Sequence, residues 1–280
     1  FGHHLAVTWN LGEENGPAHW TPIGQTDQQR KDMASWLKQI NPWPNFVVLH
    51  THANDSLQDR YLTPLLGFKA LDGPSMQIHH VGHIHNRILK FLKASAGAGK
   101  QWVIHMDEIG PADKGVVPDS FDPAHDTIRH YALWGSLMAG AGGAEWYFGY
   151  QYPHNDLACE DFRTRDKWWD QTRIATAFFT TYLPFSQMTP DDALTDNKNA
   201  YCLAKKGDLY VVFLPDGSVQ TRLDLENSGQ TFTVSWYDPR NGGPLKTGSK
   251  SRVKAEGKVN IGLPPVKENK DWVALIKAER

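Results

Sequence analysis

Short apolar runs alternate with amphipathic stretches along the first two thirds of the chain, and each run ends in polar residues. Runs of this length, bounded by polar residues, are typical of buried strands. The predicted strands are Leu5–Trp9, Phe46–Leu49, Ser75–Ile78, Trp102–His105 and Ala144–Phe148. Because strands that alternate with helices form right-handed βαβ units, the pattern predicts an α/β fold with a parallel sheet.

One helix of this region has clear boundaries in the sequence. Thr26 and Gln29 have the spacing of a capping box, and Pro42 ends the helix. Its predicted apolar stripe consists of Met33, Trp36, Leu37 and Ile40. Further helices are predicted around Ile88–Leu92, over Asp126–Met138, and along the face that carries Ile174, Phe178 and Tyr182.

The pattern changes near Pro190, where short strands separated by glycine-, asparagine- and proline-containing turns replace the alternation. The strands predicted there are Ala200–Ala204, Leu209–Leu214, Thr221–Leu225, Phe232–Trp236, Val259–Leu263 and Trp272–Ile276. Such a series predicts an antiparallel β-sandwich. We therefore predict two domains, residues 1–187 and residues 188–280.

Acidic residues stand where two of the predicted strands end. Glu108 follows Trp102–His105, and Glu13 and Glu14 follow the first strand. In a (β/α) barrel the active site lies at the carboxyl ends of the strands, and a carboxylate there is costly to desolvate unless it serves chemistry. Glycosidic cleavage needs one carboxyl group that protonates the leaving oxygen and a second that attacks the anomeric carbon or activates water. The acidic strand ends therefore predict a two-carboxylate hydrolase.

Composition excludes several classes of protein. The 280 residues carry a net charge of −2, which argues against nucleic-acid binding because that function needs a clustered basic face. No apolar run approaches the roughly 20 residues of a membrane span. Cys159 and Cys202 lack the spacing of a zinc site, and we expect no cofactor. The chain begins at Phe1 without a signal segment, so we expect it to be part of a longer protein.

Histidines gather at the ends of two predicted strands. His50 and His52 alternate by two, so both side chains can face the barrel mouth. A second group consists of His79, His80, His83 and His85. Histidine pairs ligate the metal of some barrel hydrolases, but no carboxylate or lysine stands where a dinuclear site would need one. We therefore predict no bound metal, with hydrogen bonds to sugar hydroxyls and structural roles as the alternatives.

Aromatic and charged residues near the last predicted strand are candidates for substrate contacts. Trp146, Tyr147 and Tyr150 could form a platform beneath the sugar, although core packing competes for the same side chains. The charged loop that follows serves either to bind an anionic glycan through Arg163 or as a salt-bridged lid. The predicted substrate-binding residues are Asn10, Asn15, His50, His52, His80, Asp107, Trp146, Tyr147, Tyr150, Asp156, Glu160, Asp161 and Arg163.

Four motifs resemble those of a bacterial glycoside-hydrolase-like family, which is similar to the apiosidase-like glycosidases and, more distantly, to clan A retaining enzymes. The motifs are Trp9–Asn15, Met106–Pro111, Gly149–Leu157 and Cys159–Arg163. The tail, which contains Val234–Gly243, resembles the collagen-binding module of a collagenase. The resemblance covers essentially the whole chain.

The resemblance implies that residues 1–187 are strands four to eight of a (β/α)8 TIM barrel whose first three strands are absent from this sequence. In such barrels the acid/base ends the fourth strand and the nucleophile ends the seventh. The corresponding residues are Glu14, with Glu13 as the alternative acid/base, and Glu108 as the nucleophile. The family has aspartate at the acid/base position, whereas this chain has two adjacent glutamates, so the choice between them stays open.

The expected protein is a retaining glycoside hydrolase, bacterial and secreted or periplasmic, that acts on a plant, algal or other complex polysaccharide. The missing barrel strands would come from the same parent chain or from a partner chain, and without them we expect no activity, because the predicted strands cannot close a barrel. Two alternatives stay open. One is a metal-dependent barrel hydrolase that uses His50, His52 and a carboxylate, and the other is a non-catalytic protein that binds a glycan or collagen.

Overall fold

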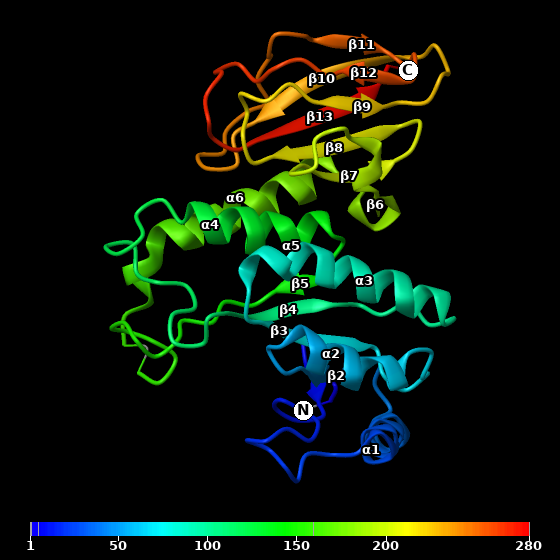
Figure 1. The fold of residues 1–280 in the computed structure, drawn as a ribbon, viewed down its shortest axis with the longest axis vertical. Helices are drawn as coiled ribbons and strands as arrows, with labels where there is room; N and C mark the ends of the chain where they lie inside the picture. Colours follow the sequence, from blue (N-terminus) through cyan, green and yellow to red (C-terminus); the bar gives the residue numbers. More distant parts are fainter. Residues whose placement is uncertain (1, 5, 159, 280) are drawn as a thin grey trace. The chain divides into compact units, whose positions relative to one another are not determined.

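The computed structural model describes residues 2–4, 6–158 and 160–279, so Leu5 and Cys159 of the predictions lie outside the described residues. The chain divides into two compact units (Figure 1). Unit 1 comprises Phe1–Asp122 and Ala141–Thr164, and unit 2 comprises Pro123–Gly140 and Arg165–Arg280. Among the helices of the described residues, none combines the length and hydrophobicity needed to span a bilayer.

Unit 1 is built on a five-stranded parallel sheet in the order β1-β2-β3-β4-β5, so neighbours in sequence are neighbours in the sheet. Figure 1 shows β2 to β5 in this order. The strands are β1 (Trp9–Asn10), β2 (Val47–His50), β3 (Gly73–Ile78), β4 (His105–Ile109) and β5 (Gly143–Ala144). The helices between them are α1 (Asp27–Ile40), α2 (Asp55–Leu62), η1 (Thr63–Leu65), η2 (Val81–His83) and α3 (Ile84–Gly97), and η4 (Phe162–Arg165) follows later. The predicted α/β class and parallel sheet are confirmed.

The capping box of α1 forms as the sequence predicts. The Thr26 side chain accepts a hydrogen bond from the backbone N–H of Gln29, and the Gln29 side chain accepts one from Thr26. The predicted apolar stripe does not mark the buried face, because Trp36 is 55% exposed and Ile40 is 53% exposed. The face that packs inward carries Arg30 and Ala34 instead. Helical spacing therefore predicted the helix but not its orientation.

A β-bulge between β3 and β4 sets the direction of the acidic residues of β4. Ser75 pairs with His105 and Met76 pairs with Met106, but the next residue, Gln77, pairs with Glu108. Asp107 is therefore the extra residue of the bulge. Strict alternation would turn Glu108 to the face of Met106, which is fully buried. The bulge brings it to the face of Gln77 instead. The strand also begins later than predicted, so Glu108 lies within β4 rather than beyond its end.

Two helical segments belong to unit 2 together with the tail. The first contains α4 (Asp126–Ile128), the π-helical turn η3 (Arg129–Trp134) and α5 (Gly135–Met138), and the second is α6 (Asp166–Tyr182). The apolar face of α6 is buried at Ile174 and Phe178, as predicted. Trp134 is fully buried and stacks on Phe213, with ring centroids 5.4 Å apart. The helices and the tail therefore share apolar contacts.

The tail of unit 2 consists of antiparallel sheets, which confirms the predicted strand class. A six-stranded sheet has the order β11-β10-β13-β8-β7-β6, and a two-stranded sheet pairs β12 with β9. The strands are β6 (Thr189–Pro190), β7 (Tyr201–Lys205), β8 (Leu209–Leu214), β9 (Arg222–Asp224), β10 (Thr231–Tyr237), β11 (Arg252–Lys254), β12 (Lys258–Asn260) and β13 (Trp272–Ala278), with η5 (Phe185–Gln187) and η6 (Asp192–Leu194) before β7. Both sheets contribute to one core, in which Leu223 packs with Phe232 and Trp236.

A half-buried carboxylate, that of Asp72, joins secondary-structure elements of unit 1. Asp72 accepts hydrogen bonds from Lys38 on α1, from the backbone N–H of Val47 at 2.9 Å, and from Lys100 at 2.9 Å. Burial raises the pKa of Asp72, but these donors outweigh it and hold the pKa below its usual value.

We expect Asp72→Asn to lower the free energy of unfolding of unit 1 by about 1–3 kcal/mol, because it leaves two ammonium groups without a counter-charge. A depressed folded-state pKa stabilises the fold above the unfolded value and loses this contribution as the pH falls. Urea unfolding at pH 6 should therefore separate the variant from the wild type, and the gap should narrow near pH 3. Asp32→Asn is the matched control on exposed α1 surface, and an equal effect of both variants would contradict the prediction.

Candidate functional site

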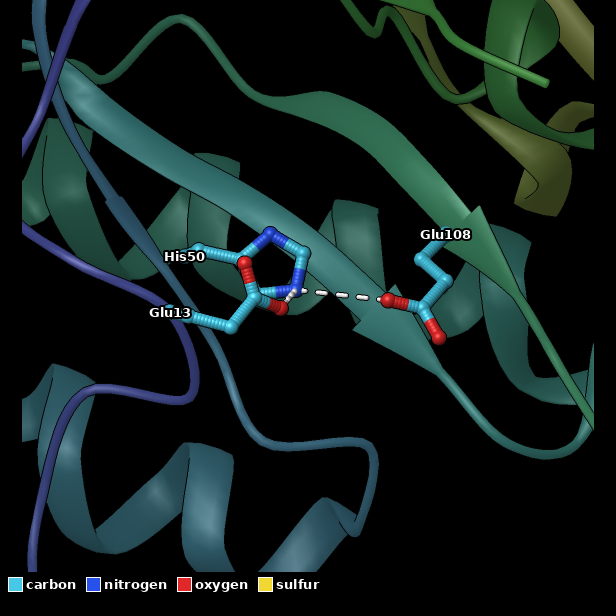
Figure 2. A group of neighbouring side chains, drawn as sticks. All are labelled: Glu13, His50 and Glu108. Carbon is cyan, nitrogen blue, oxygen red and sulfur yellow. Dashed lines mark ion pairs between the residues drawn. The ribbon is translucent and has the colours of Figure 1, made fainter. Parts of the chain in front are cut away.

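Three side chains from distant parts of unit 1 meet at one edge of the parallel sheet (Figure 2). Glu13 follows β1, His50 ends β2 and Glu108 lies on β4. The His50 Nε2 atom lies 3.0 Å from Glu13 Oε1 and 3.6 Å from Glu108 Oε2. The carboxyl ends of parallel strands converge on the same edge of a sheet, so residues far apart in sequence can come together there. We call these residues the Glu13–His50–Glu108 cluster.

Polar residues of β3 and β4 orient this cluster. Ser75 donates a hydrogen bond to Asp107, and its oxygen lies 3.1 Å from Nδ1 of His50. Gln77 donates to Oε1 of Glu108 at 2.6 Å, which leaves the other carboxylate oxygen directed toward His50. Neither Ser75 nor Gln77 was predicted as a functional residue. Ser75 and Gln77 alternate by two on β3, so both point to the same face of the sheet. Because β3 lies between the strand that ends in His50 and the strand that carries Glu108, this spacing could have identified them.

The cluster holds His50 in its charged form. Burial opposes protonation, but the neighbouring carboxylates of Glu108 and Glu13 outweigh it and raise the pKa of the imidazole to about 9. Contact with His50 in turn lowers the pKa of Glu13, against the effect of partial burial. Glu13 and His50 are therefore an ion pair at neutral pH.

Two further carboxyl groups interact with His50. Burial raises the pKa of Asp107, and partial burial together with the charge of Asp107 raises the pKa of Glu145. Burial and the charge of Glu108 raise the pKa of Tyr147 to about 12. Glu145 was not predicted as a site residue, although it directly follows β5, and Glu13 likewise stands within three residues of the end of β1. The raised pKa values favour the neutral forms of Asp107 and Glu145, while the charges of His105 and His50 oppose this shift.

Glu14 has a different environment from Glu13. It lies in a left-handed backbone conformation with φ of 37°, and its carboxylate accepts a hydrogen bond from the indole N–H of Trp20. Its Oε2 lies 3.6 Å from Nδ1 of His52, whose Nε2 lies 3.0 Å from the carbonyl oxygen of Gly16. The two adjacent glutamates therefore serve two separate groups of contacts.

The predicted asparagines support the loop that carries these glutamates. The Asn10 side chain accepts hydrogen bonds from the backbone N–H groups of Gly12 and His50. Asn15 is buried and donates to the carbonyl oxygen of Leu11 at 3.1 Å. Both side chains thus bond to the protein's own backbone near the cluster.

The predicted aromatic platform is unevenly exposed. Tyr150 is 58% exposed, whereas Trp146 and Tyr147 are half-buried. The Tyr147 hydroxyl donates a hydrogen bond to the carbonyl oxygen of Ala112 at 2.7 Å. His80 is exposed and contacts other histidine rings of the second histidine group.

The charged loop makes contacts within unit 1. Asp161 accepts hydrogen bonds from the backbone and side chain of Arg163, and Glu160 lies 3.1 Å from His154. Asp156 accepts a hydrogen bond from the backbone N–H of Phe148. These contacts stabilise the loop itself, and its two predicted roles, binding of an anionic glycan and a salt-bridged lid, stay predictions.

Among the residues that the structure describes, one group has the composition and spacing to hold a metal ion, and it is the Glu13–His50–Glu108 cluster. One ligand atom from each residue lies within 4.8 Å of the other two. His52, which the metal-dependent alternative paired with His50, is not a member of this group.

Comparison with known proteins adds information about the tail. Residues 187–277 match the family described as "Putative collagen-binding domain of a collagenase". The match confirms the predicted resemblance of the tail to that module, and it covers the antiparallel sheets of unit 2. No curated protein matches the chain. The cluster lies outside the matched module, so the resemblance of residues 1–187 to glycoside hydrolases stays a prediction.

Proposed function

We propose that residues 1–187 are strands four to eight of a TIM barrel and belong to a retaining glycoside hydrolase. The order of the parallel sheet supports this proposal, because β1 to β5 follow one another without the reversal found in doubly wound sheets. The position of the cluster at the carboxyl edge supports it as well, since barrel enzymes carry their active sites there.

The observation that carries the proposal is the distance between the two carboxylates. An oxygen of Glu13 and an oxygen of Glu108 lie within 4.8 Å of each other. Retaining glycosidases place their carboxyl groups about 5–5.5 Å apart, whereas inverting enzymes leave about 6.5–9.5 Å for a water molecule. The short separation favours attack by a carboxylate over attack by water.

Glu108 acts as the nucleophile in this proposal. The hydrogen bond from Gln77 fixes its carboxylate, and the His50 imidazolium favours its ionised form. The carboxylate attacks the anomeric carbon, the bond to the leaving oxygen breaks, and a glycosyl ester forms. Water then cleaves the ester and restores the carboxylate.

Glu13 is the acid/base that the geometry favours over Glu14, because the cluster brings it to Glu108. Its side chain is 72% exposed, so a bound sugar would remove water from it. Loss of hydration raises the pKa of a carboxyl group and opposes the effect of His50, so Glu13 takes up a proton as the sugar binds and then donates it to the leaving oxygen. Once the sugar ester has neutralised Glu108, the Glu13 carboxylate takes the proton of the attacking water.

The proposed substrate is a plant, algal or other complex polysaccharide, and the proposed location is outside a bacterial cell or in its periplasm. Exposed Tyr150 and half-buried Trp146 are available to contact a sugar ring. For the module of residues 187–277 we propose a structural or a binding role in the same protein.

The test uses the protein that contains these residues together with the remaining barrel strands, on a panel of polysaccharides. Proton NMR of the first product should show retention of anomeric configuration. Glu13→Gln should slow hydrolysis of a natural glycan by about 10²–10⁴-fold, yet spare aryl glycosides whose leaving group needs no proton. Glu14→Gln is the matched control, and the reverse pattern would assign the acid/base to Glu14. Binding without any turnover would replace the hydrolase with a non-catalytic glycan-binding protein.

A further inference from the structure

We propose that the Glu13–His50–Glu108 cluster binds a divalent transition-metal ion of the zinc type. Zinc lies about 2.0–2.2 Å from nitrogen and oxygen ligands, so tetrahedral ligands are about 3.4 Å from one another. The His50 nitrogen lies 3.0 Å from the Glu13 oxygen and 3.6 Å from the Glu108 oxygen. All three atoms lie within 4.8 Å of one another, so small rotations of the side chains would bring them around one ion (Figure 2).

The ring nitrogen of His50 supports this assignment independently of the carboxylates. His50 is only 6% exposed, and its Nε2 has no hydrogen-bond partner among the described residues. Because Glu13 Oε1 lies 3.0 Å away without accepting a hydrogen bond, that oxygen is displaced from the direction in which the nitrogen points. A buried polar nitrogen normally has a partner, and a metal ion would supply it along this direction.

The contacts behind His50 have the arrangement found around metal-binding histidines. The Ser75 hydroxyl donates its proton to Asp107, so its oxygen accepts one from Nδ1 of His50. Nδ1 thus keeps its proton, and Nε2 becomes the ligand atom when the metal ion displaces the second proton of the imidazolium. Gln77 orients the Glu108 carboxylate in the same way. The two less exposed ligands, His50 and Glu108, are therefore each oriented by a hydrogen bond from a residue that would not itself contact the metal.

The ligand types of the cluster and its exposure to solvent indicate which class of metal ion it would bind. One imidazole and two carboxylates suit a borderline ion such as Zn²⁺ better than Mg²⁺ or Ca²⁺, which take oxygen ligands. Glu13 is 72% exposed, so one side of the cluster is open to solvent. Three protein ligands with an open side leave a position for water or an anionic ligand.

Metal binding goes beyond the proposed hydrolysis and stands without it. A metal ion on Glu108 would block its attack on a sugar, so zinc and substrate would exclude each other in the retaining mechanism. Binding is measured without a glycan, so failure of the hydrolase proposal and failure of the metal site are separate results.

The test is calorimetric titration of the chelator-treated protein with Zn²⁺ at pH 8. We expect one ion per chain, and a loss of at least tenfold in affinity for Glu13→Gln and for Glu108→Gln. Glu13 is largely exposed, so its substitution leaves the core intact and circular dichroism should confirm folding. Glu14→Gln and His83→Ala are the matched controls, as an adjacent carboxylate and a surface histidine outside the cluster, and both should bind as the wild type does.

A second measurement tests the histidine through its neighbour Ser75. Cobalt should replace zinc and give a visible absorption band, and Ser75→Ala should weaken Co²⁺ binding by about 10–100-fold through the loss of its contact with His50. Absence of binding by the wild type would overturn the proposal. Binding that is unchanged in Glu13→Gln and Glu108→Gln but lost in His83→Ala would overturn it as well.

Discussion

Replacing Glu108 by glutamine is expected to reduce glycan hydrolysis by on the order of 10⁴-fold or more, while glycan binding persists. Glutamine keeps the size of the side chain and can still contact Gln77, but its amide cannot attack the anomeric carbon. The loss should appear in kcat, because the group forms a bond only during the reaction. We expect this loss to exceed that of Glu13→Gln, because Glu108 is the proposed nucleophile.

The measurement is the steady-state rate on the most active polysaccharide of the panel, with the remaining barrel strands present. An activated 2-fluoroglycoside should label the wild-type protein at Glu108 and leave the variant unlabelled. Glu256→Gln, an exposed glutamate of the matched module, is the isosteric control and should retain full activity. A Glu108→Gln variant with more than a tenth of the wild-type rate would place the nucleophile elsewhere.

Replacing Asp271 by asparagine is expected to lower the free energy of unfolding of unit 2 by about 3–5 kcal/mol. Asp271 accepts two hydrogen bonds from the Arg129 guanidinium, at 2.7 Å and 3.0 Å. The two side chains are only 5% and 3% exposed. Burial alone would lower the pKa of Arg129, but Asp271 and Asp126 outweigh it and raise the pKa. In the variant the buried Arg129 guanidinium loses the negative charge of Asp271, its more buried carboxylate partner.

Guanidinium chloride unfolding, followed by tryptophan fluorescence, measures this effect. Asp170→Asn is the matched control, because Asp170 pairs with Arg173 on the exposed side of α6 and both side chains are more than half exposed. The control should change stability by less than about 0.5 kcal/mol. The double variant Arg129→Met/Asp271→Leu should recover most of the lost stability, since neither charge then stays buried alone. A loss below about 1 kcal/mol in Asp271→Asn would contradict the prediction.

Local sequence patterns predicted the class of the sheets in both units and several elements, but not α2, β6 or β11. The capping box of Thr26 and Gln29 predicted where α1 begins, because both partners lie within one helical turn. Alternation of apolar runs with helices predicted the parallel sheet, and short strands with turn residues predicted the antiparallel tail. These signals depend on periodicity and backbone preferences, which adjacent residues express without help from distant ones.

The sequence also determined that acidic residues and a histidine occupy the ends of the strands, which named Glu13, His50 and Glu108 as candidates. Only the tertiary structure decided which of them meet. The bulge at Asp107 turned Glu108 to the face of Gln77, and the fold of the loop after β1 brought Glu13 rather than Glu14 to His50. In the same way, Arg129 and Asp271 are 142 residues apart and form a buried pair that no local pattern indicates. Contacts of this kind depend on strand register and packing, where a shift of one residue reverses the direction of a side chain.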